Sequence, residues 1–278
     1  MSSRGPLRPR DWLEVFSRIG DGVRHVVLPL SGTEAGRAPL TVGAGGDTTM
    51  ELDRAAESVV FKELAGLAER GERFSVLSEE VGHRDFGAEY PKVLVDPVDG
   101  SLNAKQGVPV FGLMLAVIDG PLVGDTTAGL VLNLNTGEEW TAVRGDGAWR
   151  GGERVAVIER GLPGRIQLLG LESTPRNIEL ARPLIERSSK LRILGSMAIS
   201  IALASAGAFD VFYSPIPVRV FDMAASLLML SENGGVATTA EGRPVAEVRC
   251  DLETRTTVLC ATTPELHEEA MAILRASR

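Results

Sequence analysis

The chain carries at residues 93–101 the sequence Val93-Leu94-Val95-Asp96-Pro97-Val98-Asp99-Gly100-Ser101, in which a short apolar run ends in two carboxylates. The apolar run predicts a buried strand, and Pro97 stiffens the turn between the two acids. Carboxylates this close repel unless a positive charge lies between them, and oxygen ligands of this kind suit Mg²⁺. Gly100 permits close approach of a ligand, and Ser101 can open a helix whose N-terminus holds phosphate. The stretch therefore predicts one side of a metal-assisted phosphate site.

The composition is that of an ordinary soluble globular protein and limits the partners. The chain has 278 residues, 44% of them hydrophobic, and a net charge of −8. Because phosphate backbones require basic stripes and none is visible, nucleic acid is not an expected partner. Residues 1–10 lack the apolar core of a secretory signal, and the longest uncharged apolar run, Phe111 to Ile118, is too short for a membrane span. We expect a cytoplasmic protein in which Cys250 and Cys260 are buried free thiols, although a bridge between them is conceivable.

Hydrophobic periodicity and turn residues predict alternating blocks of helices and strands. Between two of these blocks, residues 31–46 are Gly-rich and predict a mobile loop. The helices are expected at residues 11–28, 48–69, 176–188, 196–206, 222–233 and 264–275. The strands are expected at residues 74–77, 92–95, 111–118, 125–132, 139–144, 166–171, 191–194, 208–213, 245–250 and 257–261. We place a lobe boundary near residue 158, giving an N-terminal lobe of residues 1–158 and a C-terminal lobe of residues 159–278. The block pattern favours an α+β fold of layered sheets with mixed or antiparallel pairing.

Further carboxylates follow other predicted elements. Glu79 and Glu80 end the strand before the one that ends at Asp96. Because consecutive strands are often neighbours, we expect these acids and Asp99 to share one sheet edge, whereas either pair alone reads as a solvated acidic turn. Asp222 precedes an apolar helix and Asp53 lies early in another, so an N-cap and a helix-dipole partner are the simpler roles for them.

One rival chemistry is disfavoured by spacing. Phosphatases with a nucleophilic aspartate carry D-x-D-G-T, whereas Asp96 and Asp99 are three residues apart with proline after the first. That motif also follows the first strand of a parallel fold, and here two helices and a strand come earlier. Covalent aspartyl chemistry is therefore not the expected mechanism.

Three motifs together resemble those of the inositol monophosphatase family. They are Ser78-Glu79-Glu80, then Asp96-Pro97-Val98-Asp99-Gly100-Ser101, then Phe221-Asp222-Met223-Ala224-Ala225. The resemblance runs from about Trp12 to the end of the chain and is closest to the archaeal-type branch, which acts on inositol monophosphate and fructose 1,6-bisphosphate. It implies an α-β-α-β-α sandwich, a homodimer, and a lithium-sensitive phosphatase that uses two or three Mg²⁺ ions.

The resemblance also implies roles for individual residues. Metal ligands would be Glu79, Asp96, the Val98 carbonyl, Asp99 and Asp222. Asp53 and Ser101 would line the attacking water, with Glu79 helping to activate it, and the amides of Gly100 and Ser101 would hold the phosphate. The substrate alcohol would meet Asp99, Gly195, Ser196, Met197 and Asp222.

One departure from the family bears on the substrate. Several inositol-specific members carry a glutamate about seven residues before the motif aspartate, where this chain has the stretch Pro215-Ile216-Pro217-Val218-Arg219. Arg219 ends this stretch and is positioned in the sequence to meet an anionic group such as a second phosphate, the alternative being a solvated surface arginine. We therefore expect a phosphatase of small sugar or polyol phosphates, inositol 1-phosphate or fructose 1,6-bisphosphate. The alternatives are a phosphatase of 3′-phosphoadenosine 5′-phosphate, NADP or histidinol phosphate, and a non-catalytic binding homologue.

Overall fold

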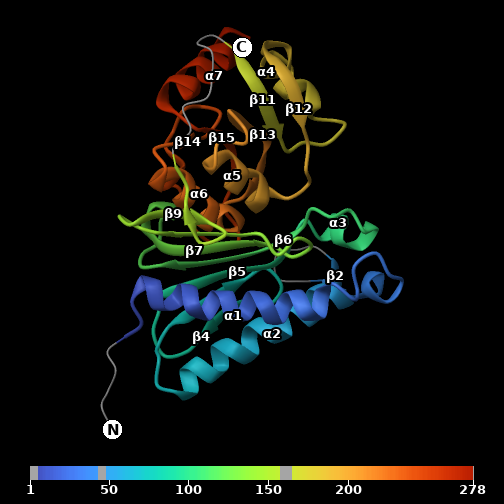
Figure 1. The fold of residues 1–278 in the computed structure, drawn as a ribbon, viewed down its shortest axis with the longest axis vertical. Coiled ribbons are helices and arrows are strands. Elements are labelled where there is room, and N and C mark those ends of the chain that lie inside the picture. Colours follow the sequence, from blue (N-terminus) through green and yellow to red (C-terminus); the bar gives the residue numbers. More distant parts are fainter. Residues whose placement is uncertain (1–5, 43–47, 157–164, 278) are drawn as a thin grey trace.

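Helices and sheets alternate in five layers along the long axis of the molecule (Figure 1). The computed structural model describes residues 6–42, 48–156 and 165–277. Helices α1 (Pro9–Val27) and α2 (Glu51–Glu69) cover the outer face of a large sheet. Helices α5 (Met197–Ser205) and α6 (Ala224–Glu232) lie between this sheet and a smaller one. Helix α7 (Pro264–Ala276) and the short α4 (Arg182–Arg187) complete the far layer, which confirms the predicted α-β-α-β-α sandwich.

The large sheet has eight strands in the order β10-β9-β8-β7-β6-β5-β3-β4. All of its pairs are antiparallel except β3 with β5. Its strands are β3 (Ser75–Ser78), β4 (Gly82–Asp85), β5 (Lys92–Asp99), β6 (Gly112–Ile118), β7 (Thr126–Asn133), β8 (Glu139–Val143), β9 (Gly147–Arg150) and β10 (Glu153–Arg154). The six-residue helix α3 (Ser101–Gln106) follows β5 directly.

The small sheet has five strands in the order β12-β11-β13-β15-β14. Strands β12, β11 and β13 run parallel, and β15 pairs antiparallel with both of its neighbours. Its strands are β11 (Ile166–Leu171), β12 (Ser188–Arg192), β13 (Val211–Arg219), β14 (Val236–Thr238) and β15 (Arg255–Ala261). The large sheet thus comes from residues before 155 and the small one from residues after 165. The predicted boundary at residue 158 falls outside the described residues.

The large sheet is apolar on both faces because helices cover both. Along β6, Leu113 and Leu115 pack in the cluster with α1 and α2, whereas Met114 and Ala116 pack with α5 and α6. Side chains of a strand alternate between faces, so an unbroken apolar run is what burial on both faces requires. Gly129 on β7 lets α6 approach closely, since a Cβ there would lie 2.6 Å from that of Ala225. This packing fixes the helix that follows Asp222.

Most predicted elements are confirmed within a few residues, and the differences have local causes. Part of the predicted loop at 31–46 is ordered as a 3-10 turn (Ala35–Arg37) and strand β1 (Pro39–Val42), which pairs with β2 (Thr48–Met50). The following helix therefore begins at Glu51 rather than near residue 48. Residues 43–47 of that loop lie outside the described part of the chain.

The strand predicted at 245–250 is wrong. Residues 245–247 form a 3-10 turn, and Val245 and Val248 are buried in the central core without strand pairing. Two backbone hydrogen bonds hold the segment instead, from Val123 N to the Val248 carbonyl and from Cys250 N to the Pro121 carbonyl. The apolar residues recur along this segment because Val245, Val248 and Cys250 pack in the core, not because the segment is a strand. Cys250 and Cys260 are both free and buried, as expected.

The region predicted as helix 176–188 is a 3-10 turn (Ile178–Ala181) followed by α4, in which Pro183 occupies the first turn. Strand β13 continues past the predicted end at residue 213, through Pro215 and Pro217 to Arg219. Its pairing with β15 is irregular between Ser214 and Val218, where the prolines remove ladder donors. Among the described helices, none is both long and apolar enough to cross a membrane.

Candidate metal and phosphate site

Two carboxylates are brought together by the parallel pairing of β3 and β5. Ser78 is the register partner of Val95, and the Glu79 amide donates to the Val95 carbonyl over 3.3 Å. Glu79 and Asp96 each follow that pair by one residue, so both stand at the same sheet edge. The prediction that these strand ends are neighbours is confirmed.

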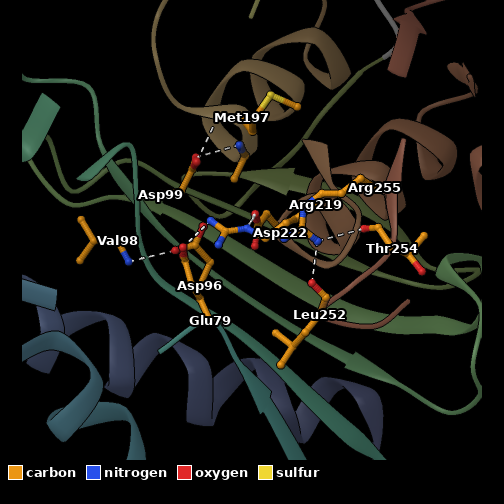
Figure 2. A network of polar contacts seen from close by, with 11 residues as sticks. Glu79, Asp96, Val98, Asp99, Met197, Arg219, Asp222, Leu252, Thr254 and Arg255 are labelled. Atoms are coloured by element: carbon orange, nitrogen blue, oxygen red, sulfur yellow. Dashed lines mark hydrogen bonds and ion pairs between the residues drawn. The ribbon is translucent and has the colours of Figure 1, made fainter. Parts of the chain in front are cut away.

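A third carboxylate comes from the second half of the chain. Asp222 lies in a 3-10 turn (Phe221–Met223) that directly precedes α6. One carboxylate oxygen from each of Glu79, Asp96 and Asp222 lies within 4.8 Å of the others (Figure 2). Asp96 is only 2% exposed and Asp222 8% exposed. Three acids from distant parts of the sequence thus converge in one largely buried group.

Their surroundings fit a bound cation. Asp222 Oδ1 is buried and has no hydrogen-bond partner among the described residues. An unpaired buried carboxylate oxygen is costly, and a hard divalent cation coordinated by oxygen ligands would satisfy it. The Val98 amide donates to Asp96 Oδ1 over 3.2 Å, which fixes the orientation of that carboxylate. The donor set therefore suits Mg²⁺ or a similar ion.

Arg219 is largely buried within this group of acids, so it is not a solvated surface residue. Its Nε donates to Asp222 Oδ2 over 2.8 Å, and its guanidinium also pairs with Glu79 Oε1. Its side chain is 16% exposed. The sequence placed this arginine beside the site but did not predict that it bridges two of the acids (Figure 2).

Burial and mutual repulsion disfavour the charged forms of these acids. Burial raises the pKa of Glu79 to about 8, and the charge of Asp222 adds to the shift. Burial, followed by the charges of Glu79 and Asp222, raises the pKa of Asp96 well above its usual range. Burial also raises the pKa of Asp222 to about 6 although Arg219 opposes the shift. Perturbed acids that share a partner in this way are typical of functional sites.

Asp99 faces a different group. In a regular strand, residues three apart point to opposite faces, so Asp96 and Asp99 would lie on different faces of the sheet. The ladder between β5 and β6, however, shifts between these two residues. This bulge leaves Asp99 directed toward the N-terminus of α5. Its carboxylate accepts hydrogen bonds from the Ser196 hydroxyl, from Met197 N over 3.1 Å and from Ala198 N over 2.8 Å. Asp99 is not within the group formed by Glu79, Asp96 and Asp222, and its role as a metal ligand stays a prediction.

The predicted phosphate and alcohol contacts lie around the same α5 terminus. Gly100 has a left-handed φ of 84°, and a Cβ there would lie 2.8 Å from the Gly195 carbonyl oxygen. Only glycine allows this close approach between the two halves of the chain. Ser101 is the first residue of α3, and Ser196 caps α5 by accepting from Ile199 N. Met197 is 9% exposed at the start of α5. The structure thus gathers these residues next to Asp99.

Asp53 is buried in the first turn of α2, 4% exposed, where its Oδ2 accepts from Met50 N over 2.9 Å. Burial raises its pKa to about 6. Its charge interacts with that of Glu80, and it does not belong to the three-acid group. The predicted helix-terminal position is confirmed, and its catalytic role stays a prediction.

Two further acids escaped the sequence analysis. Glu57, four residues after Asp53 on the same face of α2, accepts from Ser78 Oγ over 2.6 Å and from Val81 N over 3.1 Å, so it fixes the turn that carries Glu79. The spacing of Glu57 four residues after Asp53, which puts both acids on one face of a helix, is the sequence signal that could have identified Glu57. Glu172 follows β11, and its Oε2 is buried without a hydrogen-bond partner among residues 6–42, 48–156 and 165–277. Burial raises the pKa of Glu172 to about 7, helped by the charge of Asp99.

The fold and the sequence are similar to those of known proteins. The profile of the inositol monophosphatase family matches residues 30–278. A fructose-1,6-bisphosphatase/inositol-1-monophosphatase of Methanothermobacter thermautotrophicus is 30% identical over 277 residues, covering 95% of this chain and 96% of that protein. A bifunctional NADP phosphatase/NAD kinase of Methanococcus maripaludis is 26% identical, covering 95% of this chain and 49% of that protein. The crystal structure of an extragenic suppressor protein from Bartonella henselae superposes with a TM-score of 0.81 at 24% identity, covering 96% of this chain and 99% of that one.

The layered fold and the matches define the class of the protein, a phosphatase that hydrolyses phosphoric monoesters. The chain belongs to the inositol monophosphatase family.

Proposed function

We propose that this protein is a Mg²⁺-dependent phosphatase of small sugar or polyol phosphates, with inositol 1-phosphate and fructose 1,6-bisphosphate as the leading substrates. The observation that carries the proposal is the convergence of Glu79, Asp96 and Asp222, with a buried oxygen on Asp222 that has no hydrogen-bond partner among the described residues. The relative from Methanothermobacter, whose name gives both activities, supports this choice of substrates.

In this proposal Glu79, Asp96, Asp222, Asp99 and the Val98 carbonyl hold the metal ions. Bound ions would supply the positive charge that neutralises phosphate oxygens and polarises a water for attack. Two or three ions would bind in all, and Asp96 would be one of the carboxylates that hold them. A carboxylate suits this position because an amide provides no compensating charge.

The chain's own groups would then position the reactants. The amides of Gly100 and Ser101 would donate to the phosphate oxygens. Asp53 and Ser101 would hold the attacking water, and Glu79 would help to activate it by accepting its proton. Attack in line with the leaving alcohol would break the phosphorus–oxygen bond without a covalent enzyme intermediate.

The substrate alcohol would contact Asp99, Gly195, Ser196, Met197 and Asp222. The hydrogen bonds from Ser196 and Met197 to Asp99 support this grouping for the residues at the N-terminus of α5. Arg219 would meet an anionic group of the substrate. Because residues 215–219 contain no glutamate, where several inositol-specific members carry one, a strict preference for inositol is not expected. We also propose that the protein is a homodimer, that it is cytoplasmic and that lithium inhibits it.

The test is a comparison of phosphate release at fixed Mg²⁺ from inositol 1-phosphate, fructose 1,6-bisphosphate, NADP and 3′-phosphoadenosine 5′-phosphate. We expect the first two to be hydrolysed fastest and all activity to disappear with EDTA. Arg219→Ala should lower the rate on the bisphosphate more than on the monophosphate. Activity confined to the nucleotides would contradict the proposed substrate class, and no release from any ester with Mg²⁺ bound would point to a binding homologue.

NADP is the second candidate substrate because the relative from Methanococcus maripaludis carries that activity in its name. Adenine recognition generally uses aromatic stacking. The described residues close to the three acids include Phe221, but its side chain is fully buried. We therefore rank NADP below the sugar phosphates.

A further inference from the structure

A positively charged side chain already occupies part of the predicted metal site. Arg219 contacts one oxygen of Glu79 and one of Asp222, two of the three acids that lie within 4.8 Å of one another (Figure 2). The third acid, Asp96, is close enough for its charge to act on the arginine. The guanidinium therefore compensates one of the three negative charges of the group.

The three acids come from both halves of the chain. Glu79 follows β3 in the large sheet, whereas Arg219 ends β13 in the small sheet and Asp222 precedes α6. The ion pair between Arg219 and Glu79 therefore spans the two halves at the site itself. Because both partners are largely buried, this pair is screened less by solvent than an exposed ion pair.

We propose that Arg219 is a resident counter-cation of the metal site, which competes with the divalent ion for Glu79 and Asp222 and so sets the metal affinity. This inference rests on the proposed function, since it takes these acids to be metal ligands. An ion bound by the same carboxylates would lie close to the guanidinium. The positive charges of the ion and of Arg219 would then repel each other strongly, because the site is buried. Metal binding therefore has to weaken or displace the two ion pairs.

Two measurable consequences follow. Arg219 lowers the affinity for metal, and it relieves the repulsion between the acids when metal is scarce. A residue that only oriented the ligands would behave in the opposite way, because its removal would weaken metal binding. The sign of the change in affinity therefore separates the two roles.

The experiment compares Arg219→Gln with the wild type by calorimetric titration with Mg²⁺ and Mn²⁺, and by thermal unfolding in EDTA and in saturating Mg²⁺. We expect the variant to bind both ions at least tenfold more tightly. Its Tm in EDTA should fall, and its gain in Tm on adding Mg²⁺ should exceed that of the wild type. The matched control is Arg182→Gln, because Arg182 also pairs with an acid three residues away, Glu179, but both side chains are exposed. This control should leave the metal affinity within twofold.

Equal or weaker metal binding by Arg219→Gln would overturn the inference. If that variant does not fold, Arg219→Lys provides the test, since a single ammonium cannot reproduce the forked contact with two acids. The lysine variant should then bind metal several-fold more tightly than the wild type, and an unchanged or weaker affinity would again reject the competition. Failure of the wild-type protein to bind Mg²⁺ at all would instead reject the proposed function.

Discussion

Ser78 and Val95 are register partners in the parallel pair of β3 and β5, and this one pairing sets Glu79 beside Asp96. All other pairs in the large sheet are antiparallel, and the site forms at the end of this single parallel pair. The carboxyl ends of parallel strands share one edge, which brings their following residues together. The acid pair therefore follows from the sheet topology rather than from local sequence.

Asp96→Asn tests the central acid. We expect turnover to fall to less than a few per cent of the wild type in saturating Mg²⁺, because the amide adds no charge to hold the ions. The substitution also removes one of three mutually repelling buried charges, so the Tm in EDTA should stay the same or rise. Phosphate release and thermal unfolding in EDTA measure the two effects. Appreciable activity in a folded, Mg²⁺-saturated variant would refute the role of Asp96.

Two N-caps provide a second test, one at the site and one remote from it. Ser196 caps α5 and donates to Asp99, whereas Thr263 caps α7 in the outer layer. Loss of an N-cap hydroxyl costs about 1 kcal/mol, so Thr263→Ala should lower the free energy of unfolding by about that amount. Ser196→Ala should lower it by more, because buried Asp99 also loses a hydrogen bond. Only Ser196→Ala should lower kcat/KM, by about tenfold, since Asp99 loses a partner that orients it. Urea unfolding and steady-state kinetics check this expectation, and equal kinetics for the two variants would count against a role for Asp99.

The raised pKa values of the site acids predict how stability depends on pH when metal is removed. An acid whose folded-state pKa exceeds its unfolded value binds its proton more tightly in the folded protein. Its destabilising effect is absent below the unfolded pKa and grows as pH rises to the folded value. Glu79, with a pKa of about 8, and Asp222, with a pKa of about 6, therefore predict a loss of stability between about pH 4.5 and 8 in EDTA.

Urea unfolding at pH 5, 6, 7 and 8 measures this loss, which should reach a few kcal/mol because each pKa unit corresponds to about 1.4 kcal/mol. In saturating Mg²⁺ the trend should flatten or reverse, since metal binding requires the ligands to be deprotonated. The Glu79→Gln variant should show a smaller loss in EDTA. A wild-type stability that rises with pH in EDTA would contradict the assignment of these acids to one buried group.

Much of the fold was predictable because its core elements have strong periodicity. The amphipathic spacing of α1 and the long apolar runs of β6 and β7 identify helix and strands directly. Short elements were missed because their residues carry no such pattern. Strand β4, for example, is Gly-His-Arg-Asp and exists because β3 offers it an edge. The wrong strand at 245–250 shows the converse, since alternation there comes from packing in the core.

The candidate site was predictable in its residues but not in its grouping. Motif residues Glu79, Asp96 and Asp222 meet as the three-acid group, whereas Asp99 turns to α5 at a bulge that sequence spacing does not reveal. The position of Arg219 depends on how far β13 extends beyond Pro215 and Pro217, and prolines ordinarily argue for an earlier end. The pairing of β13 with β15 beyond these prolines depends on tertiary packing, which the local sequence does not reveal.

Gly195 joins the two halves of the site, and its substitution should affect both stability and substrate binding. Its φ is 75°, and a Cβ there would lie 3.0 Å from Asn103 Nδ2. That side-chain nitrogen donates to the Val110 and Leu194 carbonyls, each over 2.7 Å, so it has little freedom to move. Gly145 provides the control, because its φ of 73° is nearly the same while, chain neighbours aside, no heavy atom of the described residues lies within 4 Å of the added Cβ.

Left-handed backbone costs an alanine about 1 kcal/mol, so Gly145→Ala should lower the free energy of unfolding by about that amount and leave the kinetics unchanged. Gly195→Ala carries the same backbone cost and also displaces Asn103, so its loss should reach about 2–3 kcal/mol. It should raise KM several-fold as well, because the N-terminus of α5 would shift relative to Gly100. Urea unfolding and substrate titration of both variants decide the matter: equal losses of stability, or a KM unchanged in Gly195→Ala, would show that the close approach of the two loops does not shape the substrate site.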